Sequence, residues 1–521
     1  MRAVLSEHLP LLVSAPEGIQ KLRGLILELA VRGKLVPQDQ TDEPANALLQ
    51  RAFSKGKSSK QFTFNILGEN ECPFEVPRNW CWTSFESVFS LEYGDNLPAP
   101  KRSNSGEFPV YGSNGVVGSH SECSVTQPCI VVGRKGSAGA LNLCLNEGCW
   151  VTDVAYYCIP PAELDLEFCF KLFQTLRLDV LGKGIKPGLS RREAYALPVP
   201  IPPLAEQHRI VAKVDELMAL CERLEAEQSD AELAHARLVE SLLSTLTQSS
   251  DAADLASNWQ RIAEHFDTLF TTEGSIDALK QSILDLAVLG KLAAQEICDD
   301  AVHNTFHGIE PIQSGQSSIT NLPKKWAQCT YRSLTSLVTS GSRGWKEFYS
   351  KSGALFIRTQ NIKTDLLNLE DIAFVDLPNS TEGARARVLK GDILITITGA
   401  NVTKAAIVLE ELPEAYISQH IALTRPRWPE MSQWLHLCFI ARSAARGTLE
   451  SLAYGAKPGL NLNNIRDLVF PIPPLAEQRR IVAKVDELMA LCDRLRKDLV
   501  ESFHRKALIA TELASTALEI D

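Results

Sequence analysis

The sequence predicts an α+β protein with a pseudo-twofold internal repeat, in which long antiparallel coiled-coil helices separate two globular α/β domains. The first observation is a repeat: residues 200–224 recur at 471–495, an offset of 271, and differ at only two of these 25 positions. The second is heptad spacing within each copy. The third is that each copy follows a region rich in glycine and in short strand-like runs.

Each repeated segment opens with prolines and continues as a predicted helix. Pro202 and Pro203 mark the entry, because proline starts a helix more readily than it continues one. No glycine or proline occurs from Leu204 to Leu246, so the helix should be roughly 60 Å long at about 1.5 Å per residue. A surface helix of a globular domain is the alternative, but such helices are usually much shorter. Apolar residues expected to form the helix-packing core recur at steps of four and three, and they are Ile210, Val214, Leu217, Cys221 and Leu224, then Ile481, Val485, Leu488, Cys492 and Leu495.

A second, weaker repeat involves a shorter helix. Residues 19–35 align with 276–292, and both show apolar residues at helical spacing. The final long helix lacks a short helix after it, and the missing piece is at the N-terminus. We therefore expect the N-terminal helix to pack on the C-terminal one, which closes the pseudo-twofold arrangement.

The segments follow from these repeats. We expect an N-terminal helical segment at 1–50, a first globular domain at 51–199, a central helical pair acting as a spacer at 200–295, a linker at 296–321, a second globular domain at 322–470, and a C-terminal helix at 471–521. A polar linker is expected at 50–61, and a polar break in the central pair at 248–257. Strand-like runs in the first globular domain include 129–133 and 154–159.

Composition is that of an ordinary soluble protein, with 45% hydrophobic and 22% charged residues. No apolar run approaches a membrane span, and the 9–13 run is too short for a signal-peptide core. Thirteen irregularly spaced cysteines indicate reduced thiols and a cytoplasmic location. The spacings of Cys123, Cys129, Cys144, Cys149 and Cys158 match no zinc pattern, so no metal site is predicted. The net charge of −10 decides neither for nor against nucleic-acid binding, because distribution matters more than the mean.

Motifs of the common catalytic classes are absent from the sequence. There is no G-x-x-x-x-G-K-[ST] loop, no [ND]-P-P-[YF] motif of adenine methyltransferases, no H-E-x-x-H and no G-x-S-x-G. The ten histidines are scattered. We therefore expect a non-catalytic chain that binds no cofactor of its own.

The I-P-P-L-A-E-Q opening of a helix after each variable region, together with the K-P-G-L approach at Lys186 and Lys457, resembles the DNA-specificity subunits of type I restriction–modification systems. The resemblance covers essentially the whole chain. It implies that each globular domain is a target recognition domain that reads one half of a split, asymmetric site in double-stranded DNA. It also implies that the helices space the half-sites and dock two modification (methyltransferase) subunits. Restriction subunits would join that complex, and the partner subunits would use S-adenosylmethionine, ATP and Mg.

Candidate DNA-binding residues are polar and basic side chains in the glycine-rich loops, because Lys and Arg bind phosphates while Arg, Asn and Gln bind base edges. In the first domain they are Lys101, Arg102, Ser113, Asn114, Arg134, Lys135 and Ser137, with Lys183 and Lys186 near its end. In the second they are Arg343, Lys346, Arg358, Gln360, Asn361, Asn401, Lys404 and Lys457. A solvated surface charge is the alternative for each.

Two other functions remain open at the level of sequence. A non-catalytic coiled-coil scaffold would bind protein partners without reading DNA. A free-standing transcription regulator would need a recognition helix, and the sequence has no clear helix-turn-helix.

Overall fold

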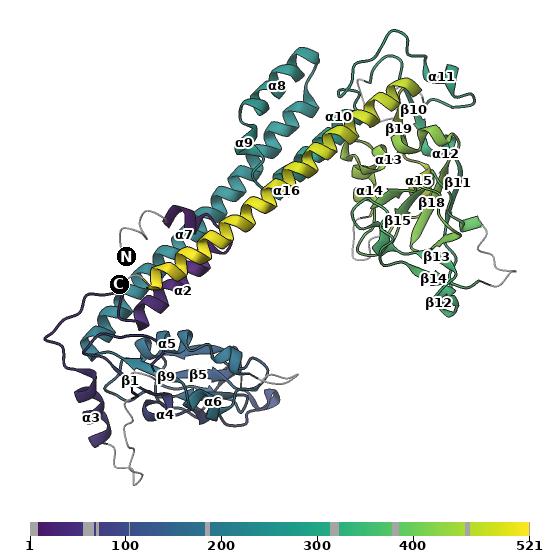
Figure 1. Cartoon of the computed structure of the whole chain (residues 1–521). Coiled ribbons are helices and arrows are strands. Elements are labelled where there is room, and N and C mark those ends of the chain that lie inside the picture. The colour runs from purple at the N-terminus through teal and green to yellow at the C-terminus, as the bar shows by residue number, and fades with distance from the viewer. Residues whose placement is uncertain are drawn as a thin grey trace. The chain divides into compact units, whose positions relative to one another are not determined.

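The computed structural model describes residues 9–55, 67–68, 72–103, 105–182, 188–312, 322–377, 385–453 and 459–519. The chain forms two compact units, unit 1 (Met1–Asp230 with Ser502–Asp521) and unit 2 (Ala231–Glu501). Two helices of 45 residues each, α7 (Leu204–Gln248) and α16 (Leu475–Glu519), contribute residues to both units (Figure 1). Both begin directly after the double prolines, as the sequence predicts.

Within the residues that the structure describes, unit 1 contains three sheets and a set of shorter helices. The sheet orders are β2-β8-β5-β6, β4-β3-β7 and β1-β9. The strands are β1 (Cys81–Ser84), β2 (Glu92–Tyr93), β3 (Phe108–Gly112), β4 (Gly115–His120), β5 (Cys129–Gly133), β6 (Leu141–Cys144), β7 (Trp150–Val151), β8 (Ala155–Cys158) and β9 (Pro198–Ile201). The helices are α2 (Gly18–Val31), α3 (Ala45–Lys55), α4 (Phe85–Val88), α5 (Leu166–Thr175) and α6 (Arg191–Tyr195).

The described part of unit 2 likewise contains three sheets. Their orders are β11-β18-β15-β16, β12-β14-β13-β17 and β10-β19. The strands are β10 (Ala327–Thr330), β11 (Thr335–Ser340), β12 (Tyr349–Ser350), β13 (Ala354–Ile357), β14 (Ala373–Val375), β15 (Ile393–Thr396), β16 (Ala405–Ile407), β17 (Ala415–Ile417), β18 (Ile421–Pro426) and β19 (Val469–Ile472). The helices are α8 (Ala252–Glu264), α9 (Phe266–Leu269), α10 (Glu273–Val288), α11 (Val302–Thr305), α12 (Tyr331–Leu334), α13 (Ser432–Ile440), α14 (Gly447–Leu452) and α15 (Leu462–Arg466).

The two units share a strand topology, apart from the additional strand β12 in unit 2, although their strand sequences differ. In each four-stranded sheet formed by β2-β8-β5-β6 or β11-β18-β15-β16, every neighbouring pair is antiparallel. The sheets β4-β3-β7 and β12-β14-β13-β17 each contain one parallel pair. These pairs are β3 with β7 in unit 1 and β13 with β17 in unit 2. In each unit a short pairing joins the first strand to the strand that leads into the long helix, β1 to β9 and β10 to β19. The internal repeat therefore extends through the variable regions.

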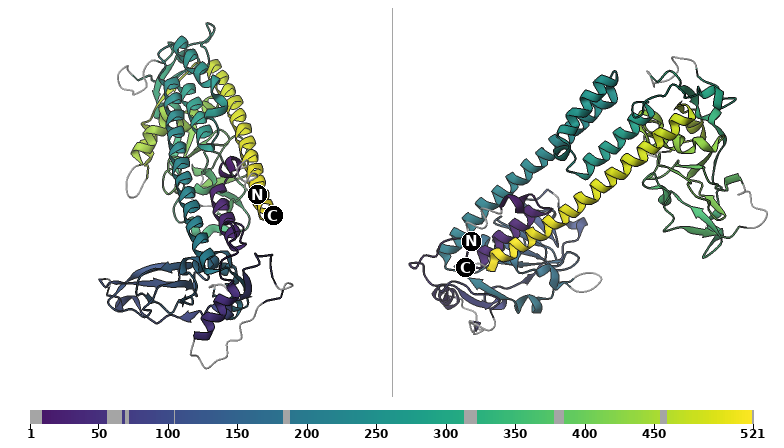
Figure 2. Two further views of the ribbon diagram at one scale, coloured as in Figure 1. Left: turned by 90° about the vertical axis from the view of Figure 1, so that its left-hand side faces the viewer. Right: turned by 45° about the horizontal axis from the view of Figure 1, so that its top comes forward.

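The long helices bury their heptad positions. In unit 1, Ile210, Val214 and Cys221 of α7 lie in one buried cluster with Ile19 and Ile26 of α2. In unit 2, Ile481, Val485 and Cys492 of α16 are buried with residues of α10, which lies beside α16 (Figure 2). The remaining expected core leucines are partly buried and pack against the same clusters, namely Leu217, Leu224, Leu488 and Leu495.

The far end of each long helix also packs. In unit 1, Ala517 near the end of α16 is buried with Leu25 and Leu29 of α2, and Lys21 donates to the Ala507 carbonyl at 2.9 Å. In unit 2, Leu243 and Leu246 near the end of α7 are buried with the α10 cluster. Each unit thus combines the start of one long helix, the end of the other and one short helix.

A junction is built twice where a long helix begins. Gly33 and Gly290, at φ of 69° and 71°, follow the short helices, and a Cβ there would lie 2.5–2.6 Å from the ring of Pro77 or Pro323. Arg209 and Arg480 each bind one carboxylate through two nitrogens. Arg209 pairs with Asp42, the shorter contact being 2.6 Å, and Arg480 pairs with Asp299 at 2.7 and 3.0 Å.

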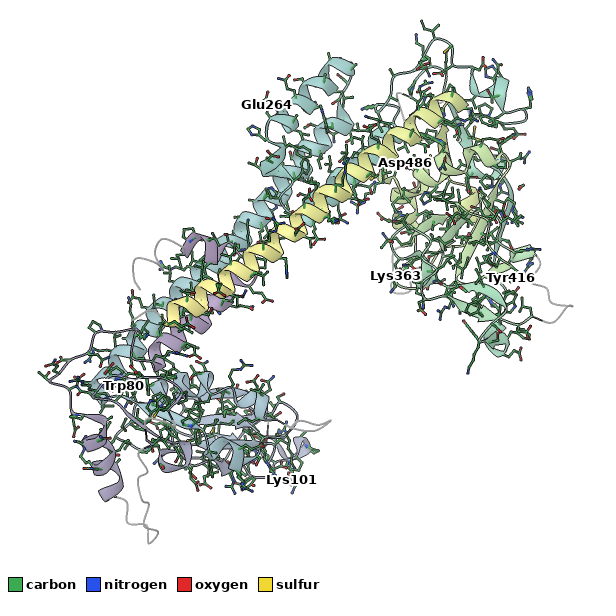
Figure 3. The ribbon with its side chains drawn as sticks, in the orientation of Figure 1. Trp80, Lys101, Glu264, Lys363, Tyr416 and Asp486 are labelled. Carbon is green, nitrogen blue, oxygen red and sulfur yellow. The ribbon has the colours of Figure 1, made fainter. Side chains whose placement is uncertain are left out.

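The two junctions differ at their tryptophans. The indole N–H of Trp80, a residue labelled in Figure 3, donates to Glu206 at 2.9 Å. The corresponding Trp326 packs edge-on against Trp434 at 5.4 Å, and its indole N–H has no hydrogen-bond partner within the described part of the chain. Burial raises the pKa of the Glu206 carboxyl.

Three segments differ from the expected linkers. Residues 50–55 continue α3, whose Leu48 and Leu49 are fully buried, while 56–61 lie outside the described residues. The expected break at 248–257 is only 249–251, because the Asp251 side chain caps α8 by accepting from the N–H groups of Ala253 and Asp254. Residues 296–312 are packed rather than free, since Val302 and Phe306 are buried. In the first and third segments, polar composition concealed a few apolar anchors.

Among the helices that the structure describes, none has both the length and the apolar character that crossing a bilayer requires.

Candidate nucleic-acid interface

In unit 1 the fold brings two glycine-rich turns together. Ser113 and Asn114 form the turn of the β3–β4 hairpin, and Arg134, Lys135 and Ser137 lie in the β5–β6 connection. The two turns approach so closely at Gly133 that a Cβ there would lie 2.4 Å from the Ser113 carbonyl oxygen. Five sequence-predicted residues therefore lie in one surface region, and glycine is what permits their proximity.

Two arginines flank an exposed tyrosine beside these turns. The Arg134 guanidinium lies 4.6 Å from the Tyr93 ring centroid, and the Arg191 guanidinium lies 4.3 Å from it. Backbone carbonyls fix both cations, because Arg134 donates to Asp153 at 3.0 Å and Arg191 donates to Leu91 at 3.1 Å. Tyr93 is 47% exposed, so the group presents two held cations and an aromatic face to solvent.

Tyr93 and Arg191 were not among the sequence-predicted residues. Tyr93 precedes one of the turn-like glycines, and Arg191 follows the K-P-G-L-S stretch, so both adjoin predicted loops. A rule that includes aromatic residues next to glycine-rich loops would have found Tyr93, since aromatic and guanidinium planes stack well in nucleic-acid sites.

Lys101 and Arg102 precede β3 in the same unit. Arg102 donates to the Val117 carbonyl at 3.2 Å and so reaches the β4 strand. Val116 and Val117 are 58% and 45% exposed. Lys101 is exposed on the surface of unit 1 (Figure 3).

The segment that ends the first domain, at Gly188 and Leu189, pairs with the β5–β6 turn. Gly188 bridges to Lys135, and the Leu189 N–H donates to the Arg134 carbonyl at 2.9 Å. Lys183 and Lys186 lie outside the described residues. In unit 2 an equivalent β-bridge joins Gly459 to Thr398. Lys457 lies outside the described residues.

In unit 2, three candidates stabilise their own loop. Asn361 is only 2% exposed, and its side chain accepts from the Arg358 N–H and donates to the Asn368 and Asp371 carbonyls. Arg358 donates to the Asp371 carbonyl at 3.1 Å, and Gln360 donates to the Asp371 carboxylate at 2.6 Å. These contacts give the three residues a role in holding the 358–371 loop.

Two further candidates in unit 2 also contact protein groups. Asn401 donates to the Thr359 carbonyl at 3.1 Å, and Lys404 binds Asp365 at 3.3 Å. Arg446, which is 4% exposed, binds the same carboxylate. Arg343 is exposed, whereas the side chain of Lys346 lies outside the described part.

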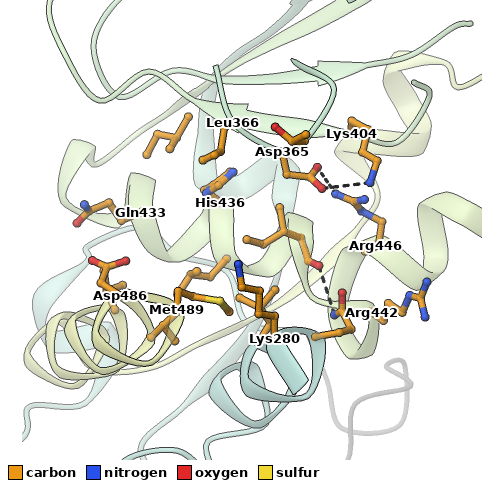
Figure 4. A pocket seen from close by; sticks show the side chains of 18 of the residues that line it. Lys280, Asp365, Leu366, Lys404, Gln433, His436, Arg442, Arg446, Asp486 and Met489 are labelled. Carbon is orange, nitrogen blue, oxygen red and sulfur yellow. Dashed lines mark hydrogen bonds and ion pairs between the residues drawn. The ribbon is translucent and has the colours of Figure 1, made fainter. Parts of the chain in front are cut away.

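A cavity of about 470 Å³ adjoins the Asp365 ion pairs (Figure 4). Its wall includes Lys280, His436 and Met489 from three different helices. Burial lowers the pKa of His436, and its Nε2 lies 3.1 Å from the Ala405 carbonyl oxygen. A neutral imidazole that donates to this carbonyl explains both observations. The charges around the cavity are largely paired, which indicates a structural arrangement.

Comparisons with known proteins identify the class. Residues 77–235 match the family model described as the type I restriction modification DNA specificity domain. The chain is 30% identical to the EcoEI specificity subunit of Escherichia coli over 569 residues, which cover 96% of this chain and 94% of the relative. It is 29% identical to the E. coli EcoAI specificity subunit over 564 residues, with the same coverage. The chain therefore belongs to the family of type I restriction enzyme specificity subunits.

A solved structure also aligns with the chain. It is titled "Structural basis underlying complex assembly and conformational transition of the type I R-M system", and its match covers 86% of this chain and 99% of that one. The TM-score is 0.49 and the sequence identity is 17%. Specificity subunits are the non-catalytic members of their systems, which agrees with the absence of catalytic motifs from the sequence.

Proposed function

We propose that this chain reads a bipartite, asymmetric sequence in double-stranded DNA, with each sheet-containing unit reading one half. The observation that carries the proposal is that the two units share a strand topology, apart from the additional β12, but place different side chains at equivalent turns. The β5–β6 turn carries Arg134 and Lys135, whereas the corresponding turn after β15 carries Thr398 and Asn401. A common scaffold with different turn chemistry suits two different short recognition sequences.

In the first unit, the two turns and the Tyr93–Arg134–Arg191 group would form the DNA-binding surface. Arg191 and Lys135 would contact phosphates, because cations near a surface bind the backbone without reading sequence. Asn114 and Ser113 would approach base edges, and the exposed Val116 would contact a thymine methyl group. Unit 2 would read through Arg343 and the Thr398 region, since Arg358, Gln360, Asn361, Asn401 and Lys404 all contact protein groups.

The long helices would set the gap and dock partners. At about 1.5 Å per residue, a 45-residue helix is about 68 Å long, and one inserted heptad shifts a domain by about 10 Å. The near-identical starts of α7 and α16 would offer two equivalent surfaces, so two copies of one methyltransferase subunit would bind a single chain. Restriction subunits would join through them. The partners would supply S-adenosylmethionine, ATP and Mg chemistry, and the complex would act in the cytoplasm.

The test is methylome sequencing. The chain is co-expressed with the modification subunit of its own operon in a host that lacks DNA methylation, and modified bases are mapped across the genome. The proposal predicts one bipartite motif with a fixed gap. Formation of the complex without modified bases, and without DNA retention in a shift assay, would instead support a protein scaffold.

A further inference from the structure

Three cysteine thiols meet in the interior of unit 1, at the end of the β5–β6 hairpin opposite its turn. Cys129 begins β5 and Cys144 ends β6, and the antiparallel register places them opposite each other. Cys149 precedes β7 and is held by paired backbone hydrogen bonds with Val125, both of 2.9 Å. All three are fully buried, and their sulfur atoms lie within 4.8 Å of one another.

The distance between two of the sulfur atoms matches the distance expected when both bind one metal ion. Zinc–thiolate bonds are about 2.3 Å long, so two sulfurs on one tetrahedral zinc lie about 3.8 Å apart. The Cys129 and Cys149 sulfur atoms are 3.8 Å apart. A cation of that size would therefore need little movement of the strands.

Cys144 lies beside a hydroxyl as well as two thiols. The Tyr111 hydroxyl and the Cys129 and Cys149 thiols all lie within hydrogen-bonding reach of the Cys144 sulfur. A thiolate is the form of cysteine that binds metals. The Tyr111 hydroxyl also provides an oxygen beside the three sulfurs.

Neighbouring positions lack this arrangement. Cys158 lies in β8 of the same sheet but packs in the other core cluster, away from the three thiols, and burial raises its pKa to about 12. The topologically equivalent sheet of unit 2, β11-β18-β15-β16, contains no cysteine. The thiol cluster is therefore a particular feature of the first unit.

We propose that Cys129, Cys144 and Cys149 bind a thiophilic divalent cation of the Zn²⁺ type, with the Tyr111 hydroxyl next to the fourth position. Binding forms three metal–sulfur bonds, and every thiol still protonated releases its proton to solvent, which leaves a net charge of −1 on the ion and its three thiolates. The ion would join β5, β6 and the entry to β7, which carry or support the turns with Ser113 and Arg134. This inference goes beyond the proposed function and does not depend on it.

The sequence spacings gave no sign of this site. Zinc patterns in sequence rely on closely spaced ligand pairs, whereas here the three sulfurs come from different strands and meet through strand register. Because bound thiols must lose protons, the affinity is expected to fall as the pH is lowered.

The experiment measures metal content of the full chain by mass spectrometry after expression in zinc-supplemented medium. We expect about one zinc per chain, and near-complete loss in Cys129→Ser, Cys144→Ser and Cys149→Ser. Cys158→Ser is the matched control, since it removes a buried thiol from the same sheet, and it should retain the metal.

Cobalt substitution keeps the test decisive if the cluster variants fail to fold. The wild-type chain, stripped of metal under reducing conditions and given Co²⁺, should develop sulfur-to-cobalt charge-transfer absorption. Absence of both zinc and cobalt uptake by the wild-type chain would overturn the proposal. So would equal metal content in Cys144→Ser and wild type, or equal loss in Cys158→Ser.

Discussion

The two sheet domains of this specificity subunit share strand order but use their equivalent loops differently. In the first, the β5–β6 turn presents Arg134 and Lys135 beside the exposed Tyr93. In the second, Asn361 and Lys404 are tied to carbonyl and carboxylate groups of their own domain. A polar residue in a glycine-rich loop can therefore have either of two roles. It can bind a ligand, or it can stabilise the loop through contacts within the protein. Burial and hydrogen-bond partners separate the two roles.

The largest expected effect comes from filling the close approach of the two turns. In Gly133→Ala the new Cβ would lie 2.0 Å from the Ser137 carbonyl oxygen and 2.4 Å from that of Ser113. We expect a loss of about 3 kcal/mol in the free energy of unfolding, at the upper end of overpacking costs, and loss of DNA retention. Urea denaturation of the chain measures the first.

The control for this variant is Gly274→Ala. Gly274 is a helical glycine in α10 with open space around its Cβ position. Alanine there should stabilise the helix by about 0.5–1 kcal/mol. Equal destabilisation by both substitutions would contradict the assigned role of Gly133.

The repeated junction gives the next effect. Arg480→Ala removes two nitrogen contacts to a fully buried Asp299 carboxylate, and Arg209→Ala removes the equivalent contacts to Asp42, which is 7% exposed. We expect each to cost about 2 kcal/mol, with Arg480→Ala at least as costly, because charged hydrogen bonds contribute about 1.5–3 kcal/mol. Differential scanning calorimetry of both variants tests whether the junctions are equivalent. If Arg480→Ala left the stability unchanged while Arg209→Ala lowered it, the junctions would not be equivalent.

The same junction predicts a pH dependence. Hydrogen bonds from Arg480 hold the pKa of Asp299 below its ordinary value of 3.8. A carboxyl whose pKa is depressed in the folded state stabilises the fold above its unfolded pKa, and this contribution is lost as the pH falls through the folded pKa. Arg480→Gln should therefore lose less stability than wild type between about pH 4 and the acid limit of folding. Parallel acid-denaturation profiles would argue against the pairing.

A smaller effect separates the two loop roles directly. Asn361→Ala should cost about 1–2 kcal/mol of folding stability, because it removes three side-chain hydrogen bonds that hold the 358–371 loop. Asn114→Ala, at an exposed turn, should leave stability unchanged within about 0.5 kcal/mol and alter only the methylated motif. Thermal melts of the two variants make the comparison, and an unstable Asn114→Ala would remove the distinction.

The smallest effect concerns a single phosphate contact. Arg191→Gln should weaken DNA binding of the assembled complex for all sequences alike and reduce the slope of log K against log salt by about 1. The matched variant is Arg358→Gln in unit 2, whose guanidinium contacts Asp371 and should leave that slope unchanged. A titration series at several salt concentrations tests both.

Much of the helical framework could be predicted from the sequence. The bounds of α7 and α16 follow from prolines before them and the absence of glycine and proline within them, and the heptad spacing marks residues such as Ile210 and Ile481 that are fully buried. The segments expected as linkers were less predictable. A few apolar anchors such as Leu48 and Phe306 outweigh a polar composition, and a window average conceals them.

The site was predictable only in part. Glycine-rich turns indicated where Arg134 and Asn114 would lie, but not that Gly133 lets the two turns touch. The sequence suggested DNA binding for Asn361 as well. It could not show that Asn361 is buried, because this burial depends on contacts with Asn368 and Asp371 that no short window contains. The shared topology of the two domains and the meeting of Cys129 with Cys144 both depend on strand register, which differing strand sequences do not reveal.

We propose that the two domains are equivalent scaffolds that read different halves of one DNA site. The most direct measurement is the methylome of a chain in which residues 72–199 are replaced by the corresponding segment of the EcoEI relative, co-expressed with its modification subunit. We expect one half of the motif to change while the other half and the gap stay the same. A change in both halves, or in the gap alone, would contradict it.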